Sequence, residues 1–99
     1  MTTGTLYGIG VGPGDPDLIT VKGARMLSKA HHVFVPKARP AADSLAHRIA
    51  DKHLSDQATI HELVFPMLKD RSKLEEWWAG AAREVAEVLR RGEDACFIT

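Results

Sequence analysis

The chain has 99 residues, of which 44% are hydrophobic and 26% are charged, a balance that fits one globular domain. Thirteen basic residues offset thirteen acidic ones, and this zero net charge argues against nucleic-acid binding driven by bulk charge. No apolar run reaches the ~20 residues that cross a bilayer, and the N-terminus lacks the basic region of a signal peptide. Because Cys96 is the single cysteine, an internal disulfide is excluded, and we expect a cytoplasmic protein without a membrane partner.

The first recognisable element is a strand over residues 5–11, which runs into the glycine- and proline-rich stretch 8–16. Glycine allows a left-handed or closely approached backbone, and proline fixes φ, so the stretch predicts a stiff loop with little side-chain bulk. Such loops lie at the carboxyl edge of parallel sheets, where ligands bind in open α/β folds. The alternative is a tight strand-to-helix turn without a ligand.

Three helical patterns alternate with three further strand patterns. Thr20 is a candidate N-cap for a helix over 21–30, with Val21, Ala24 and Leu27 as its apolar stripe. The β-branched run 31–36 predicts a strand that Pro36 ends. The next elements are a helix capped by Asp43 or Ser44 that reaches about residue 54, and a strand over 59–65.

The last helix has the clearest pattern. Ser72 and Glu75 match an S-x-x-E capping box, and Gly92 is a candidate C-terminal stop. Its predicted buried face consists of Leu74, Trp77, Trp78, Ala81, Ala82, Val85, Val88 and Leu89. A strand over 94–99 follows. The resulting β-α-β-α-β-α-β order with short connections predicts a three-layer α/β/α fold with a mostly parallel sheet.

The glycine stretch does not match the common nucleotide-binding fingerprints. G-x-G-x-x-G would need a glycine where Pro13 or Asp15 stands, and no lysine follows the glycines before Lys22, which excludes a P-loop. The Asp15 carboxylate would also repel a phosphate placed over the loop. A neutral or cationic ligand therefore fits better.

The sequence GVGPGDP over residues 10–16, followed by LITVK over 18–22, resembles the opening of the tetrapyrrole (corrin/porphyrin) methylases. The resemblance implies an S-adenosylmethionine-dependent enzyme with two α/β domains and an active-site cleft between them. Residues 1–99 would then be the N-terminal domain, with a C-terminal domain in the same chain and a homodimeric assembly. The strand at 95–99 ends without a turn signal, so we expect a fragment whose next cofactor loop, strand and helix follow residue 99. The alternative is a chain that ends on a short strand.

Within the family, the sequence FPM at 65–67, the pair Val35-Pro36 and the tryptophan-rich helix resemble the members that methylate precorrin-2 at C20. The resemblance implies methyl transfer to a ring carbon of precorrin-2 or its cobalt form in cobalamin biosynthesis. Alternatives are another corrin-ring methylase, a diphthine synthase-like enzyme, a flavodoxin-like nucleotide-binding module, or a structural fragment that binds nothing. Many relatives carry a Tyr-Asp pair where this chain has Pro36-Lys37, so no catalytic base is assigned.

The predicted cofactor contacts are the backbones of Gly12, Pro13 and Gly14, and Asp15 either fixes the loop as an Asx turn or meets a ligand. Lys37 and Arg39 are candidates for binding the carboxylates of a precorrin, the alternative being two solvated charges.

Methyl transfer from a sulfonium needs alignment of the reactants and exclusion of water rather than a nucleophilic triad or a metal. The five histidines lack the spacing of a helical metal pair, so we expect them to be structural or exposed, with no metal site. Cys96 is predicted to be a small core residue. Trp77 and Trp78 are predicted to serve as core and interface residues rather than as a stacking platform.

Overall fold

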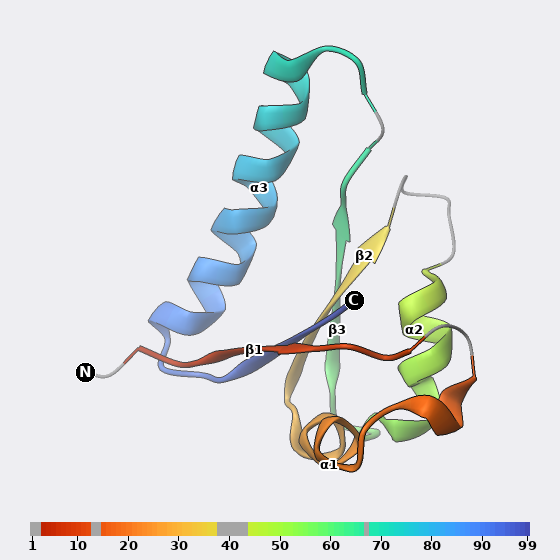
Figure 1. Ribbon diagram of the computed structural model, residues 1–99. Helices are drawn as coiled ribbons and strands as arrows, with labels where there is room; N and C mark the ends of the chain where they lie inside the picture. Colours follow the sequence, from red (N-terminus) through yellow and green to blue (C-terminus); the bar gives the residue numbers. More distant parts are fainter. Residues whose placement is uncertain (1–2, 13–14, 38–43, 67) are drawn as a thin grey trace.

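The computed structural model describes residues 3–12, 15–37, 44–66 and 68–99, and these form three layers (Figure 1). The middle layer is one parallel sheet with the strand order β1-β4-β2-β3. Its strands are β1 (Leu6–Ile9), β2 (His32–Lys37), β3 (Thr59–Val64) and β4 (Ala95–Ile98). The predicted fold class is thus confirmed, with every strand pair of the described sheet parallel.

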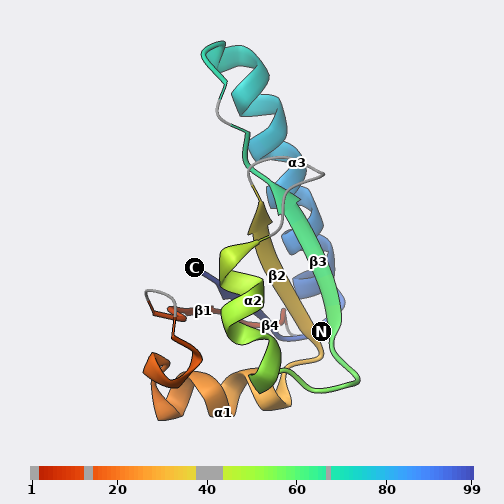
Figure 2. The ribbon, with the colours of Figure 1, turned by 90° about the vertical axis from the view of Figure 1, so that its right-hand side faces the viewer.

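Helices cover both faces of the sheet. Two helices lie on one face and the long one lies on the other (Figure 2). They are α1 (Val21–Lys29), α2 (Leu45–Ala50) and α3 (Arg71–Arg90), and two short 3-10 helices, η1 (Pro16–Leu18) and η2 (Asp51–His53), precede α1 and follow α2. No helix among the described residues is long and apolar enough to cross a membrane.

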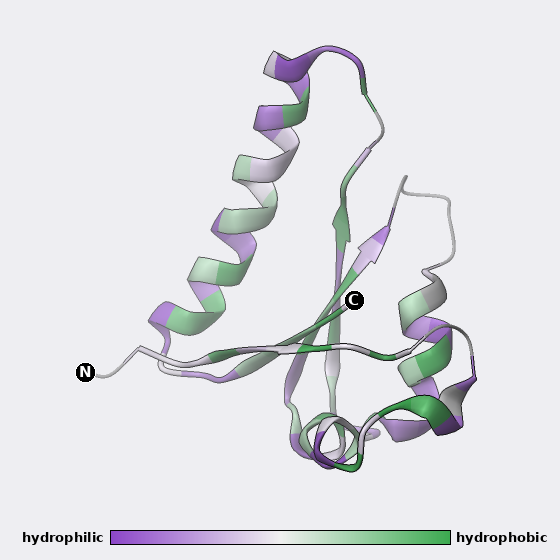
Figure 3. Cartoon of the chain, in the orientation of Figure 1, coloured by the Kyte–Doolittle hydropathy of each residue, from purple (hydrophilic) through white to green (hydrophobic). Residues whose placement is uncertain are grey.

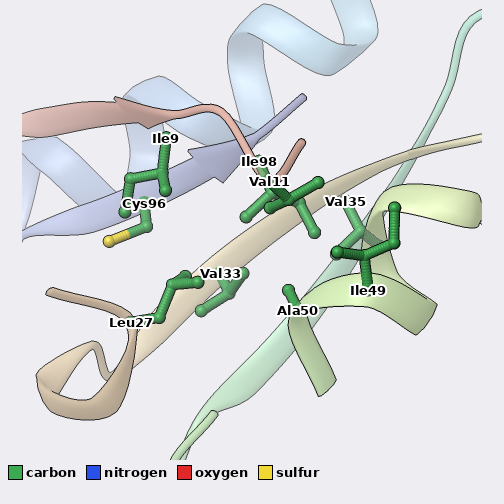
Figure 4. Packing of buried hydrophobic residues seen from close by; sticks show 9 residues of the cluster. All are labelled: Ile9, Val11, Leu27, Val33, Val35, Ile49, Ala50, Cys96 and Ile98. Carbon is green, nitrogen blue, oxygen red and sulfur yellow. The ribbon is translucent and has the colours of Figure 1, made fainter. Parts of the chain in front are cut away.

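Alternation along the strands divides the core into two parts. Val33 and Val35 of β2 point toward α1 and α2, where they join Leu27, Ile49, Ala50 and other buried side chains (Figure 4). Phe34, between them in sequence, points the other way and packs with Val88 of α3. Both parts are fully apolar, as a sheet covered on two faces requires. Figure 3 shows hydrophilic residues on the first turn of α3 and in the loop before it.

Cys96 lies in the core part that faces α1, as predicted. Burial, with a smaller contribution from the Asp94 carboxylate, raises the pKa of its thiol. The thiol therefore stays protonated near neutral pH and acts as a small apolar side chain.

Helix α1 begins as the sequence predicts, but its buried face differs from the predicted one. The Thr20 hydroxyl accepts a hydrogen bond of 3.0 Å from the Gly23 N–H, which confirms the N-cap. Val21, expected in the apolar stripe, is 74% exposed, and the buried residues are Gly23 and Leu27. A Cβ on Gly23 would lie 3.1 Å from Ile9 Cγ2, so the glycine allows α1 to approach β1 closely.

Helix α3 does not use the predicted capping box. The Asp70 carboxylate caps it by accepting hydrogen bonds from the Ser72 and Lys73 N–H groups at 2.9 and 3.4 Å. Ser72 lies inside the first turn of the helix, because Asp70, two residues earlier, already accepts hydrogen bonds from N–H groups of that turn. Gly92 does end the helix as predicted: its φ is +80° and its N–H bonds to Leu89 O at 3.0 Å.

The predicted buried face of α3 is only partly correct. Val88 is buried and Ala81, Val85 and Leu89 are half-buried against the sheet, but Ala82 is exposed. Trp77 and Trp78 are each 44% exposed, so the prediction that they are core residues is wrong. The physical reason is position, since the first turns of α3 extend past the carboxyl ends of the strands (Figure 1). The tryptophans therefore lie at the rim of the sheet, where Trp77 borders the end of β3 without being covered by it.

The observed cap makes a direct prediction. Asp70→Ala should lower the free energy of unfolding by about 1 kcal/mol, because two N–H groups lose their acceptor. Ser72→Ala, which the sequence pattern alone would have ranked as equally damaging, should have a much smaller effect. Urea unfolding monitored by circular dichroism measures both variants, and a larger loss for Ser72→Ala would contradict the assignment of the cap.

Candidate functional site

The glycine loop leaves the carboxyl end of β1 directly beside the end of β4. The Thr99 N–H bonds to Ile9 O at 3.0 Å, and the Val11 N–H bonds to Thr99 O at 3.2 Å. This pairing holds the start of the loop against the sheet as far as Val11, which is itself buried. The loop therefore begins from a rigid base at the edge where ligands bind in parallel α/β sheets.

Gly12 is the first residue of the loop whose backbone requires glycine. Its φ is +86°, a left-handed conformation that side chains disfavour. A Cβ at this position would also lie 3.3 Å from Leu18 Cβ. The predicted contacts Pro13 and Gly14 lie outside the described residues, as does Arg39.

Asp15 ends the loop as the predicted Asx turn. Its carboxylate accepts a hydrogen bond of 2.9 Å from the Asp17 N–H, and its carbonyl accepts one of 2.9 Å from the Leu18 N–H. The residue thereby caps η1. Its side chain has a structural function in the described loop, and its carboxylate is exposed at the same edge.

A second contact, which sequence patterns do not reveal, fixes the exit from the loop. Lys52 Nζ lies 2.6 Å from Asp17 Oδ1 and joins η1 to η2. The Lys52 ammonium lowers the pKa of the Asp17 carboxyl by a hydrogen bond and by its charge. The two residues are 35 positions apart, so only the packing of α1 beside η2 brings them together.

Lys37, the described member of the predicted substrate-binding pair, is the last residue of β2. Its Nζ lies 2.5 Å from Glu62 Oε2 on the neighbouring strand, and its side chain is only 10% exposed. The lysine thus lies at the carboxyl edge, as expected, but its ammonium is bound by a carboxylate of the protein. A largely buried lysine held in this way fixes the end of the strand.

The opposite, amino edge of the sheet carries a histidine cluster that sequence spacing did not reveal. His32 Nδ1 lies 2.9 Å from His61 Nε2, and His32 Nε2 is paired with the Glu93 carboxylate. The His61 ring stacks on Phe34 with centroids 4.6 Å apart. Burial, followed by the charge of His32, lowers the pKa of His61. Register on adjacent strands explains the contact, because two histidines 29 positions apart enter β2 and β3 near the same level.

The described residues contain no group of three or more side chains suited to hold a metal ion, and both His32 nitrogens are already engaged within the cluster. A hollow of about 720 Å³ lies at this amino edge, between the end of α1 and the start of β4. Along β1, beside Gly8, Gly10 and Gly23, a second hollow has a volume of about 500 Å³. The described part of the glycine stretch therefore borders this second hollow through Gly8 and Gly10.

Comparison with known proteins identifies one family. The family model of the Tetrapyrrole (Corrin/Porphyrin) Methylases matches residues 5–99. The chain is 36% identical to a probable cobalt-precorrin-2 C(20)-methyltransferase of Methanocaldococcus jannaschii, over 95% of this chain and 39% of that protein. It is also 36% identical to the cobalt-precorrin-2 C(20)-methyltransferase of Salmonella typhimurium, over 97% of this chain and 40% of that protein.

A more partial match concerns a different reaction. The chain is 43% identical to a cobalt-precorrin-4 C(11)-methyltransferase of Priestia megaterium, over 52% of this chain and 23% of that protein. In the two C20-methyltransferase matches, the chain spans only about two-fifths of the relative's length.

The histidine cluster predicts how stability depends on pH. Because the folded state lowers the pKa of His61 below its ordinary value of 6.5, the unfolded chain binds the proton more tightly. The stabilisation is complete above pH 6.5 and is lost as the pH falls from 6.5 toward the folded-state pKa. Urea midpoints measured between neutral and mildly acidic pH should fall more steeply for the wild type than for His61→Gln. His31→Gln, at an exposed neighbouring position, serves as the control and should follow the wild type. Parallel curves for His61→Gln and wild type would contradict the prediction.

Proposed function

Because the chain belongs to the tetrapyrrole (corrin/porphyrin) methylases, we propose that it is the N-terminal domain of an S-adenosylmethionine-dependent methyltransferase. The proposed substrate is precorrin-2 or its cobalt form, methylated at C20 on the route to cobalamin. The observation that carries this choice is the match of nearly the whole chain to two proteins named for that reaction. A cytoplasmic, homodimeric enzyme and a second domain that forms the other wall of the cleft belong to the same proposal.

The glycine loop is the proposed cofactor-binding element. When bound, S-adenosylmethionine supplies a methyl group already activated by its sulfonium. Gly12, Pro13 and Gly14 would hold it through backbone groups, since none of them carries a large side chain. The positive φ of Gly12, the Asx turn of Asp15 and the Asp17–Lys52 ion pair support this proposal, because they define the backbone at the two described ends of the loop. A preorganised loop loses less conformational freedom on binding.

The substrate-binding residues follow from charge. A precorrin carries several carboxylates, and a guanidinium binds a carboxylate in bidentate fashion. Arg39 is the preferred anchor, because the Lys37 ammonium is held by Glu62 and would have to exchange that partner. Lys37 instead fixes the end of β2, two residues before Arg39. No catalytic base is proposed, and the contribution of this domain is to bind and orient the reactants.

A second candidate within the family is another corrin-ring methylase. The 43% identity to a precorrin-4 C11-methyltransferase favours it, although that match covers half of the chain. Product analysis by mass spectrometry and NMR, after incubating the complete enzyme with cobalt-precorrin-2 and S-adenosylmethionine, distinguishes the two. A methyl group at C20 of cobalt-precorrin-2 supports the first candidate. No methylation of cobalt-precorrin-2, together with methylation of cobalt-precorrin-4 in a parallel assay, supports the second.

Cofactor binding at the loop can be tested with one substitution. In the complete protein, Gly12→Ala should weaken the binding of S-adenosylhomocysteine about tenfold or more, because the left-handed backbone would have to change. Gly8→Ala is the matched control, since a Cβ there has no heavy atom within 4 Å. Isothermal titration measures both, with thermal unfolding as a check on folding. Preferential binding of FMN or ATP by the wild type would support a flavodoxin-like module and overturn the proposal.

Substrate anchoring predicts a different kinetic pattern. Arg39→Ala should raise KM for the tetrapyrrole about tenfold or more, with a smaller effect on kcat, because a charge-assisted hydrogen bond stabilises by about 1.5–3 kcal/mol. Arg25→Ala, at an exposed position on α1, is the control and should leave KM unchanged. Steady-state assays of the complete enzyme decide the matter, and an unaltered KM for Arg39→Ala would remove Arg39 from the site.

A further inference from the structure

The outer edge of β3 has no strand partner among the described residues, because β3 is the end strand of the sheet. The Thr59 N–H bonds to His31 O and the Phe65 N–H bonds to Lys37 O, each at 2.7 Å. Backbone groups in a strand alternate in direction, so the even-numbered residues Ile60, Glu62 and Val64 direct their N–H and C=O groups outward. Such a row is a template for an added strand.

Helix α3 runs beside this edge (Figure 2). Between the helix and the strand lies a groove with a volume of about 440 Å³. We name it the β3–α3 groove; its lining residues are Glu62, Leu63, Val64, Glu76, Trp77, Gly80, Ala81 and Glu84. None of the residues of the glycine loop is among them. The groove is therefore separate from the proposed cofactor site.

Trp77 and Gly80 give the groove an aromatic wall with space beside it. The Trp77 side chain is 44% exposed, so part of its indole is open to solvent at the groove. One turn further along the helix, a Cβ on Gly80 would meet only the end of the Arg83 side chain, at 3.8 Å. A side chain of a bound segment could therefore lie flat against the indole without displacing the helix.

The charge of the groove indicates what would bind there. Two of its lining residues, Glu76 and Glu84, are glutamates of α3. The third glutamate, Glu62, has the same strand parity as Ile60, so its side chain lies on the α1 and α2 face of the sheet. No lining residue is basic, although the end of the Arg83 side chain lies beside Gly80. Glu62 is paired with Lys37, whereas Glu76 and Glu84 are exposed on the same side of α3 as Trp77. Carboxylates around an exposed indole suit lysine or arginine, which can pair with the acids and stack on the ring.

We propose that the β3–α3 groove binds an extended, basic segment of a partner protein, which adds to the edge of β3 as a further strand. Backbone hydrogen bonds to Ile60, Glu62 and Val64 supply affinity in this mode, and the side-chain sites supply specificity. A second copy of the chain fits less well. Two β3 edges paired about a two-fold axis would bring Glu62 close to its own counterpart and bring together two acidic helix faces.

The test uses the complete protein and a fluorescein-labelled peptide of alternating valine and arginine. Fluorescence anisotropy at low salt should show saturable binding. Trp77→Ala and the double variant Glu76→Gln/Glu84→Gln should each weaken it about tenfold or more, a loss of 1.4 kcal/mol or more. Glu87→Gln, which removes an exposed glutamate of the same helix outside the groove, is the matched control and should change little. Trp77→Phe should retain part of the affinity, which separates recognition from misfolding.

Backbone pairing has its own readout. A peptide methylated at alternate backbone nitrogens keeps its charge but cannot form the ladder, so it should lose binding. Hydrogen exchange of the Ile60, Glu62 and Val64 amides should slow when the unmodified peptide is bound. Equal binding by the methylated peptide, or no saturable binding up to millimolar concentration, would overturn the proposal. A dimer in sedimentation that Glu62→Lys dissociates would overturn it in favour of a second copy.

Discussion

The insertion of β4 between β1 and β2 is the constraint on which the rest of the structure depends. Its pairing with β1 joins residues almost ninety positions apart, as in Leu6 with Ala95, and its pairing with β2 makes one sheet of the two halves. The same insertion holds the start of the glycine loop, because the Thr99 N–H donates a hydrogen bond to Ile9 O and the Thr99 carbonyl accepts one from the Val11 N–H. Contacts of such long sequence separation carry a large loop-closure entropy, so the loop has its base only where the two ends of the chain are brought together.

The two edges of the sheet carry different groups, because in a parallel sheet all strands begin at one edge and end at the other. The carboxyl edge carries the described part of the glycine loop, the Asp15 turn and the Lys37–Glu62 pair. At the amino edge, His32, His61 and Glu93 form a closed polar network that ties β2, β3 and the loop before β4 together. The amino edge is thus closed by contacts within the protein, whereas the carboxyl edge is the proposed ligand site. The β3–α3 groove lies to the side of both, where the sheet ends.

Patterns that depend on neighbours in sequence predicted well. The Thr20 and Ser44 caps, the Gly92 stop and the alternation of elements are all observed, since each rests on hydrogen bonds within a few residues. The predicted start of α3 was wrong, because both Asp70 and Ser72 can cap a helix and the sequence pattern did not show which of them does so. It failed again at Val21 and the tryptophans, because helical periodicity shows which side chains share a face but not whether strands lie beneath that face.

The sequence by itself determined the order of the elements, the parallel α/β class and, through the motif at residues 10–16, the family. Those properties depend on residues that are close together in sequence, so short patterns are enough to predict them. Tertiary structure alone decided that Lys37 is bound by Glu62, that Lys52 holds Asp17 at the loop exit, and that His32 meets His61. Each of these contacts joins residues from different elements, so it exists only after strand register and helix packing have set their separation.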